Sequence, residues 1–209
     1  MPETSHVVIT PTDTPRQVAV MIIAQWISSG AFPDRILDSL PAQKAVVSEM
    51  VLGAVKWRRE LDWIVTRHVR VMPDAFIHAC FITACYQLFH MDAEAAYAVV
   101  NDAVDMVKQQ GYPPRMAGLV NASLRRIAGS RDKLRQEIAR QSPGIRLSHP
   151  DILVSRWEER WGSVRTESLC RWNNERPELV IRLFTSRVEL PAFIAQLRDA
   201  GIDAMPHPH

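Results

Sequence analysis

The stretch Ala75–Phe89, AFIHACFITACYQLF, decides the fold that we predict for this chain. Apolar residues occupy nearly every side of a helix drawn through it, and His78 and Gln87 are among its few polar side chains. A helix that is hydrophobic all round is buried on every side, in a protein core or in a membrane. A membrane span needs roughly 18 consecutive apolar residues, which this stretch does not reach. We therefore expect a central core helix with other elements packed around it.

The segments on both sides of this stretch carry apolar residues at the spacing of an amphipathic helix. Thr14-Pro15 reads as an N-cap followed by a helix-starting proline, and Met72-Pro73-Asp74 reads as a break that caps the central helix. Further helices are predicted over residues 15–28, over 42–69 as one long helix or two abutting helices, over 93–112, and within 117–135. Residues 15–142 should therefore form an all-helical bundle, preceded by a flexible tail at residues 1–14.

The pattern changes after Ser142-Pro143-Gly144. Two short helices are predicted, at residues 151–161 and 164–172. The segment LVIRLF, residues 179–184, alternates and is rich in β-branched residues, which predicts a strand. A helix containing Leu190 and the start of a second strand follow. Because a stable sheet needs about three strands or a packed helical layer, the predicted fold is mainly α, with linker helices and an incomplete α/β subdomain over residues 148–209.

Basic residues are concentrated after Asn121, although the formal net charge of the whole chain is only +2. Between Asn121 and Arg146, seven basic and two acidic residues give a local charge of +5, which leaves −3 for the rest. Such a patch attracts a polyanion, because each phosphate contact by Arg or Lys releases counterions. A solvated helix face is the alternative explanation. The cluster Lys56-Trp57-Arg58-Arg59, and Arg16 at the start of the first predicted helix, offer the same chemistry.

The sequence contains no motif that predicts catalysis, cofactor binding or a metal site. Neither a GxGxxG nor a GxxxxGK[ST] loop occurs. The histidines are scattered, and Cys80, Cys85 and Cys170 form no CxxC pair, so we interpret them as reduced packing residues. The N-terminus lacks the basic start and long apolar centre of a signal peptide. The cytoplasm is therefore the expected compartment, and no membrane contact is expected.

Several motifs, taken in order, resemble a known family. The bundle segments are similar to the NusB-like helical domain at the N-terminus of bacterial ribosomal RNA cytosine-C5 methyltransferases: they read TPRQVAVMIIAQW, VSEMVLGAVKWRRELDWIV, CYQLFHM, AYAVVNDAVDMVK and AGLVNASLRR. The later segments LSHPDILVSRWEERWG, CRWNNERPELVIRLFTSR and LRDAGIDAMP resemble the linker and small α/β subdomain that precede the catalytic domain of those enzymes. The resemblance extends over about residues 15–206. Its most specific part is AVVNDAVDMVK followed by LVNASLRR.

The resemblance implies an RNA-binding module without catalytic residues of its own. Family members carry an S-adenosylmethionine-binding domain, a glycine-rich loop and two catalytic cysteines downstream, and this chain contains none of them. S-adenosylmethionine is thus implied only for the missing catalytic domain. Ile181–Phe184 departs from the RVN-like sequence of relatives. Asn101 and Asn121 match recurring asparagines, to which we assign a structural role because amides can join helix ends and loops. The implied RNA contacts are Arg16, Lys56, Arg58, Arg59, Arg125 and Arg126.

The leading hypothesis is the RNA-binding N-terminal region of an S-adenosylmethionine-dependent ribosomal RNA (cytosine-C5) methyltransferase, which positions the RNA and lacks catalysis on its own. The alternative is a stand-alone NusB-type transcription antitermination factor that binds RNA and a ribosomal protein. The extra segment at residues 148–209 argues against it. A helical protein-interaction scaffold is a third hypothesis. The expected partners are RNA, chiefly ribosomal RNA, and a separate or missing methyltransferase domain, but not DNA.

Overall fold

The computed structural model divides the chain into two units, Met1–Asn174 and Glu175–His209. Within them, the structure describes residues 13–40, 44–91, 95–176, 179–184 and 188–206. Most of the predicted flexible tail, residues 1–14, therefore lies outside the described residues. The described part is mainly helical and contains no strand. The mainly α fold class is thus confirmed. No described helix is both long enough and apolar enough to cross a membrane.

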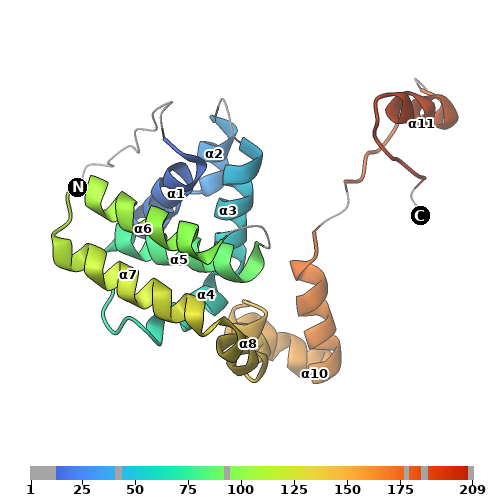
Figure 1. Ribbon diagram of the computed structural model, residues 1–209. Coiled ribbons are helices and arrows are strands. Elements are labelled where there is room, and N and C mark those ends of the chain that lie inside the picture. The colour runs from blue at the N-terminus through green and yellow to red at the C-terminus, as the bar shows by residue number, and fades with distance from the viewer. Residues whose placement is uncertain (1–12, 41–43, 92–94, 177–178, 185–187, 207–209) are drawn as a thin grey trace. The chain divides into compact units, whose positions relative to one another are not determined.

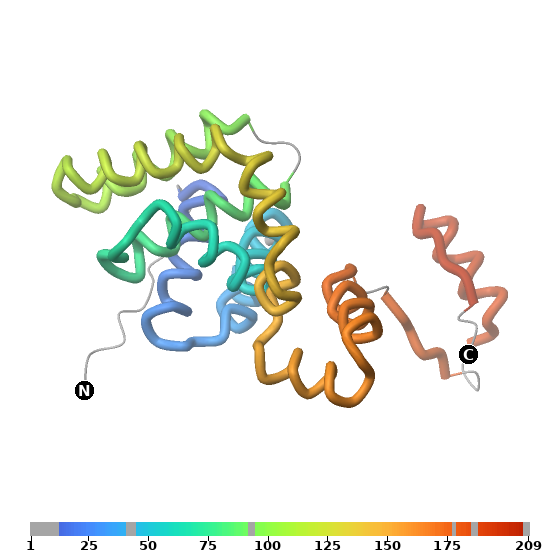
Figure 2. Tube along the Cα trace, turned by 90° about the horizontal axis from the view of Figure 1, so that it is seen from below, coloured from blue at the N-terminus to red at the C-terminus, as the bar shows by residue number. Residues whose placement is uncertain are grey.

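The first unit is a bundle built around one helix (Figure 1). Its helices are α1 Pro15–Ser29, α2 Pro33–Asp38, α3 Lys44–Lys56, α4 Arg58–Thr66, α5 Ala75–His90, α6 Ala96–Gln109, α7 Pro114–Gly129, α8 Arg131–Ala139, α9 Pro143–Arg146 and α10 Asp151–Asn174. Helices α1, α3, α4, α6 and α7 all pack against α5. Figure 2 shows α6 and α7 running side by side along one side of the bundle.

Helix α5 is the predicted core helix. Its residues from Ala79 to Phe89 are all buried. The carboxylate of Asp74 caps its start by accepting a hydrogen bond of 2.9 Å from the Ile77 N–H, which satisfies one of the otherwise unpaired N–H groups of the first turn. The central position and the cap are both confirmed.

Helix α1 begins where the sequence predicted. The Thr14 hydroxyl accepts from the Gln17 N–H at 3.3 Å, and the Gln17 side chain accepts from the Thr14 N–H at 2.7 Å, so the two residues form a capping box. The helix ends at Ser29, before Gly30, whose φ of 70° is a left-handed conformation that glycine adopts without steric cost.

The region predicted as one or two helices is two, α3 and α4. Trp57 separates them, with φ −91° and ψ 14°. Gly53, near the end of α3, lies against the ring of Tyr86 on α5. A Cβ at this position would lie 2.0 Å from Tyr86 Cζ, so the contact between α3 and α5 requires a residue without a side chain.

The predicted pair of short helices after residue 150 is the two halves of α10. Gly162 breaks the helix with φ 77° and ψ 164°, a conformation that is essentially restricted to glycine. Leu147, Val154 and Cys170 form a small core with Trp157, separate from the main one. The first compact unit includes α10 and ends at Asn174.

In the second unit, the structure describes one helix, α11, which spans Leu190–Asp199. The chain leaves it through Gly201, whose φ is 76°. Residues 179–184 adopt neither helix nor strand, so the predicted strand and the α/β character of this subdomain are not confirmed. A strand forms only when its backbone N–H and C=O groups pair with a neighbour, and no described segment of the unit supplies one.

Candidate nucleic-acid interface

The six basic residues predicted to contact RNA fall into two groups in the structure. Four of them make intramolecular contacts. Arg16 is one, with its side chain only 20% exposed. Its Nε–H donates to the Gln87 Oε1 at 2.6 Å, and its guanidinium forms an ion pair with Asp102. Because Gln87 is buried on α5 and Asp102 lies on α6, Arg16 joins three helices and satisfies a buried amide.

Arg58 is held in a polar cluster between α1, α4 and α5. Its Nε–H donates to Asp62 at 2.6 Å, and its guanidinium lies 5.1 Å from the centre of the Trp26 ring. His78 Nε2 lies 2.6 Å from the other oxygen of Asp62. Burial raises the pKa of Asp62, but the hydrogen bonds from His78 and Arg58 and the charge of Arg58 outweigh burial, so the pKa is below its ordinary value.

Lys56 and Arg59 fasten α10 to the bundle. Both guanidinium –NH groups of Arg59 donate to Asp151, at 2.9 and 2.6 Å, and one also donates to the carbonyl oxygen of His149. This two-pronged contact lowers the pKa of Asp151. The ammonium group of Lys56 donates to the carbonyl oxygen of Asn174 at the end of α10. These contacts explain why the first unit extends beyond residue 142.

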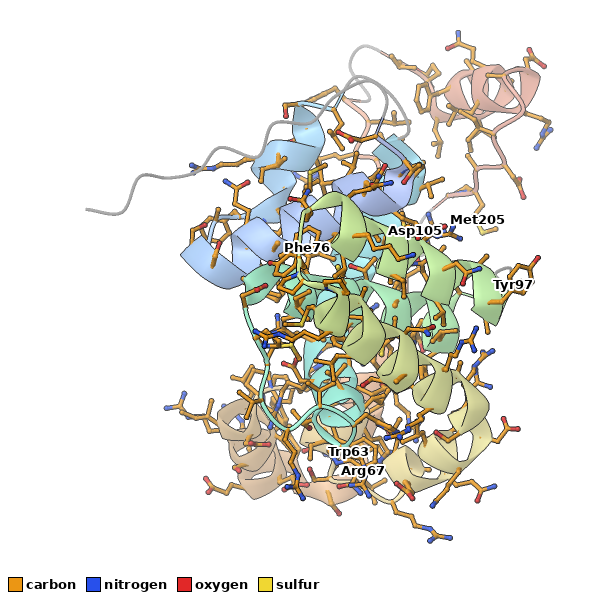
Figure 3. The ribbon with its side chains drawn as sticks, turned by 60° about the vertical axis from the view of Figure 1, so that its left-hand side comes forward. Trp63, Arg67, Phe76, Tyr97, Asp105 and Met205 are labelled. Atoms are coloured by element: carbon orange, nitrogen blue, oxygen red, sulfur yellow. The ribbon has the colours of Figure 1, made fainter. Side chains whose placement is uncertain are left out.

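A further contact that joins the bundle to α8 comes from a residue that the sequence did not single out. Arg67 follows the last turn of α4 and lies over the ring of Trp63, with 4.5 Å between its Cζ and the ring centre (Figure 3). Its guanidinium also forms an ion pair with Glu137 on α8, at 3.1 Å. Arg67 therefore also makes intramolecular contacts.

Arg125 and Arg126 form the other group. Both are exposed on α7, while the adjacent Leu124 and Ile127 are fully buried and hold the helix against the core. In the part of the chain that the structure describes, neither guanidinium makes a hydrogen bond or an ion pair. An arginine without an internal partner keeps its forked donors available for a phosphate. Of the six predicted contacts, these two are the ones available to a ligand.

The structure does not show what the two predicted structural asparagines do. Asn101 is exposed and Asn121 is partly buried, and no hydrogen bond joins either side chain to another described residue. Their structural role stays a prediction.

The three cysteines are buried and unpaired, as predicted for packing residues. Burial, with a smaller effect from the charge of Asp74, raises the pKa of Cys80 to about 12. Burial likewise raises the pKa of Cys85 and of Cys170. A thiol reacts as its thiolate, so none of these is a ready nucleophile at neutral pH. No group of three His, Cys, Asp or Glu side chains among the described residues could hold a metal ion.

The bundle and the segment after it match two family models. The NusB family model matches residues 13–129. The model of the Methyltr_RsmF/B-like, ferredoxin-like domain matches residues 149–209.

Curated relatives match across both regions. "Probable ribosomal RNA small subunit methyltransferase B" of Synechocystis sp. is 30% identical over 87% of this chain and 44% of its own length. "Ribosomal RNA small subunit methyltransferase B" of Pseudomonas putida is 28% identical over 91% of this chain and 44% of its own length. The protein of the same name from Escherichia coli is 26% identical over 92% and 46%. The chain thus spans somewhat less than half the length of the curated relatives it matches. Because the NusB family model covers more than half of its residues, this chain belongs to the NusB family.

Proposed function

We propose that this chain binds ribosomal RNA through the exposed side of α7, with Arg125 and Arg126 as the leading phosphate contacts. The proposal rests on one difference: these two residues have no internal partner among the described residues, whereas the other four predicted contacts do. Arg16, Arg58 and Arg59 already pair with carboxylates, and breaking such a pair to reach RNA would cost free energy. Arg125 and Arg126 can contact RNA without breaking an internal ion pair.

In this proposal the chain positions RNA for methylation at C5 of cytosine and does not methylate on its own. The relatives are named ribosomal RNA small subunit methyltransferases, and the region that this chain matches is less than half of each. S-adenosylmethionine would be bound by a polypeptide corresponding to the rest of those relatives. The same polypeptide would supply the strands that let residues 179–184 complete a small α/β subdomain. The site of action would be the cytoplasm, where bacterial ribosomes are assembled.

The match at residues 149–209 favours this function over a stand-alone antitermination factor. A factor that only binds RNA and a ribosomal protein has no evident use for a segment similar to a methyltransferase domain. Lys56 and Arg59 also join α10 to the bundle, so the start of that segment is structurally part of the first unit.

The test compares the variant R125A/R126A with the charge-matched control R35A/R70A. Arg35 and Arg70 are also exposed, they lie outside α7, and they make no internal polar contact within the described residues. Binding of a fluorescently labelled single-stranded ribosomal RNA fragment is measured by anisotropy at several salt concentrations. Loss of two phosphate contacts should lower the slope of log affinity against log salt by about 1.4. The control should keep the wild-type slope, and both variants should keep the wild-type helical circular dichroism.

Two results would contradict the proposal. If the wild-type chain binds no RNA at low salt, or binds it with no salt dependence, the basic residues only solubilise a protein scaffold. If R125A/R126A binds like the wild type, the RNA contacts lie elsewhere on the chain.

A further inference from the structure

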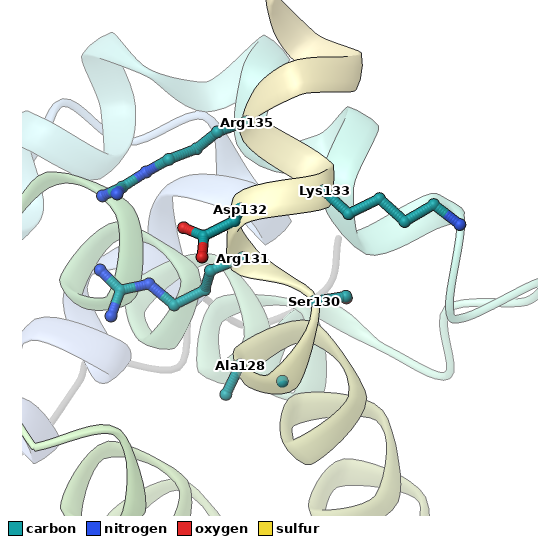
Figure 4. Close-up of a pocket in the computed structure, with 7 residues that line it drawn as sticks. Ala128, Ser130, Arg131, Asp132, Lys133 and Arg135 are labelled. Atoms are coloured by element: carbon teal, nitrogen blue, oxygen red, sulfur yellow. The ribbon is translucent and has the colours of Figure 1, made fainter.

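A surface hollow of about 380 Å³ lies where α7 ends and α8 begins. It is lined by Ala128, Gly129, Ser130, Arg131, Asp132, Lys133 and Arg135 (Figure 4). In this view the side chains of Arg131, Asp132 and Arg135 extend to one side, and Lys133 extends to the opposite side. The family resemblance implied no role for any of these residues. In the sequence, the basic residues among them only add to the local positive charge after Asn121.

Arg131 lines the hollow and carries a buried donor without a partner. Its Nε is buried, yet it has no hydrogen-bond acceptor among the described residues. A buried donor without an acceptor is costly, and a charged one more so, unless a ligand or water supplies the acceptor. Arg135 extends to the same side and makes one long contact of 3.4 Å with the Phe89 carbonyl oxygen. The guanidinium groups of Arg131 and Arg135 thus extend to the same side of α8, and the Nε of Arg131 has no acceptor among the described residues.

The backbone adds donors at the same place. Helix α8 starts at Arg131, and its first internal hydrogen bond is the one from the Leu134 N–H to the Ser130 carbonyl, at 2.9 Å. Ser130 does not cap the helix with its side chain, because its hydroxyl donates back to the Arg126 carbonyl oxygen at 2.7 Å. The N–H groups of the first turn of α8 therefore lack the usual capping acceptor.

Asp132 is the one acidic residue in the lining, and no ion pair joins it to Arg131 or Arg135 in the described structure. Its carboxylate lies in the first turn of α8, where a negative charge is favourable for the helix. It does not neutralise the two guanidinium groups by direct contact. It would repel an anion in the hollow. Removing its charge should therefore strengthen RNA binding, whereas removing the arginines should weaken it.

The hollow also adjoins the proposed RNA-binding residues. Arg125 is three and four positions before Ala128 and Gly129, and Arg126 is four positions before Ser130. Residues at these spacings are neighbours on one helix face. A strand of RNA crossing Arg125 and Arg126 therefore passes beside the hollow.

We propose that this hollow binds one phosphate group of the RNA backbone. In this site Arg131 and Arg135 donate to the phosphate oxygens, and the N–H groups at the start of α8 add backbone donors. This inference rests on the proposed function, because the phosphate belongs to the RNA that Arg125 and Arg126 contact. A phosphate bound in the hollow would hold the RNA strand at one position along α7 and α8. Without such a subsite, the basic residues would attract the RNA only through their general positive charge.

The test uses the whole chain and three variants. R131A/R135A removes both guanidinium groups, R131K/R135K keeps the charge but not the forked donors, and D132N removes the carboxylate. RNA affinity is measured by anisotropy as above, and the backbone amides of Ser130–Lys133 are followed by NMR during titration with inorganic phosphate at constant ionic strength. R131A/R135A should bind RNA about tenfold more weakly, and R131K/R135K should recover only part of the loss. D132N should bind RNA more tightly, and phosphate should shift the Ser130–Lys133 amides in the wild type.

The outcomes separate this inference from the proposed function. If R125A/R126A weakens RNA binding and R131A/R135A and D132N do not change it, the subsite is refuted and the proposed function stands. If phosphate shifts the amides but none of the hollow variants changes RNA affinity, the hollow binds free phosphate only, which also refutes the inference. If the wild-type chain binds no RNA, both fail together. A folded R131A/R135A is verified by its circular dichroism, and D132N tests the inference even if R131A/R135A does not fold.

Discussion

Gly53 gives the sharpest test of the packing. For Gly53→Ala, helix propensity predicts a rise in the free energy of unfolding, and the contact with Tyr86 predicts a fall. Replacing a helical glycine with alanine normally stabilises the helix by about 1 kcal/mol. Here the new Cβ would lie 2.0 Å from Tyr86 Cζ and 2.1 Å from its Oη, so the ring must retreat to at least the 3.4 Å of ordinary contact.

Tyr86 has little freedom to move away. It is only 4% exposed, its ring stacks on His90 with 5.4 Å between the centres, and its hydroxyl donates to the Glu49 Oε1 at 2.7 Å. Overpacking of this kind costs about 1–3 kcal/mol, and loss of the hydrogen bond to Glu49 costs about 1 kcal/mol more. The steric effect outweighs the gain in helix propensity. We expect G53A to be destabilised by about 1–3 kcal/mol, which lowers Tm by about 2–4 °C for each kcal/mol in a chain of this size.

The assay is urea unfolding followed by far-UV circular dichroism, with G118A as the control. Gly118 is also inside a helix, α7, but a Cβ there would meet nothing within 4 Å. G118A should therefore be stabilised by about 0.5–1 kcal/mol. In a Y86A background, G53A should cause no further loss, because the clash is gone. The reasoning fails if G53A is as stable as the wild type or more stable, as G118A is expected to be.

Three further predictions concern stability. The guanidinium groups of Arg146 and Arg171 hold the pKa of Glu167 at about 2, below its ordinary 4.5, so this stabilisation is present above pH 4.5 and is lost as the pH falls towards 2. Because the Glu167 side chain is 34% exposed, E167Q should cost only about 1 kcal/mol at pH 7, and its difference from the wild type in urea unfolding should shrink below pH 4.5 and vanish only below pH 2. G162A should lose about 1–3 kcal/mol in the same assay, since the backbone conformation of Gly162 is strained for alanine; an unchanged midpoint would refute the strain. T14A should lose about 1 kcal/mol and T14S little, and equal losses would exclude the capping box as the cause.

The sequence by itself determined the longer helices of the bundle and the helix at its centre. Thr14 and Asp74 cap backbone N–H groups three residues further along the chain. These contacts are local, so they can be predicted from the sequence. The all-round apolar composition of Ala75–Phe89 requires burial whatever its neighbours are. The predicted strand at residues 179–184 was different, because a strand depends on a pairing partner that its own residues do not specify.

Only the tertiary structure decided which arginines lack an internal partner among the described residues. Arg16, Arg59 and Arg125 are all basic residues of predicted helices, and the local sequence does not show which of them will find an internal partner. Their difference arises because the partner of Arg16 is 86 residues away at Asp102 and the partner of Arg59 is 92 residues away at Asp151, whereas Arg125 meets none among the described residues. The hollow at the start of α8 also depends on the angle between two helices, which no local pattern of side chains specifies. Charge can be counted along a chain, but the pairing of charges depends on which elements the core brings together.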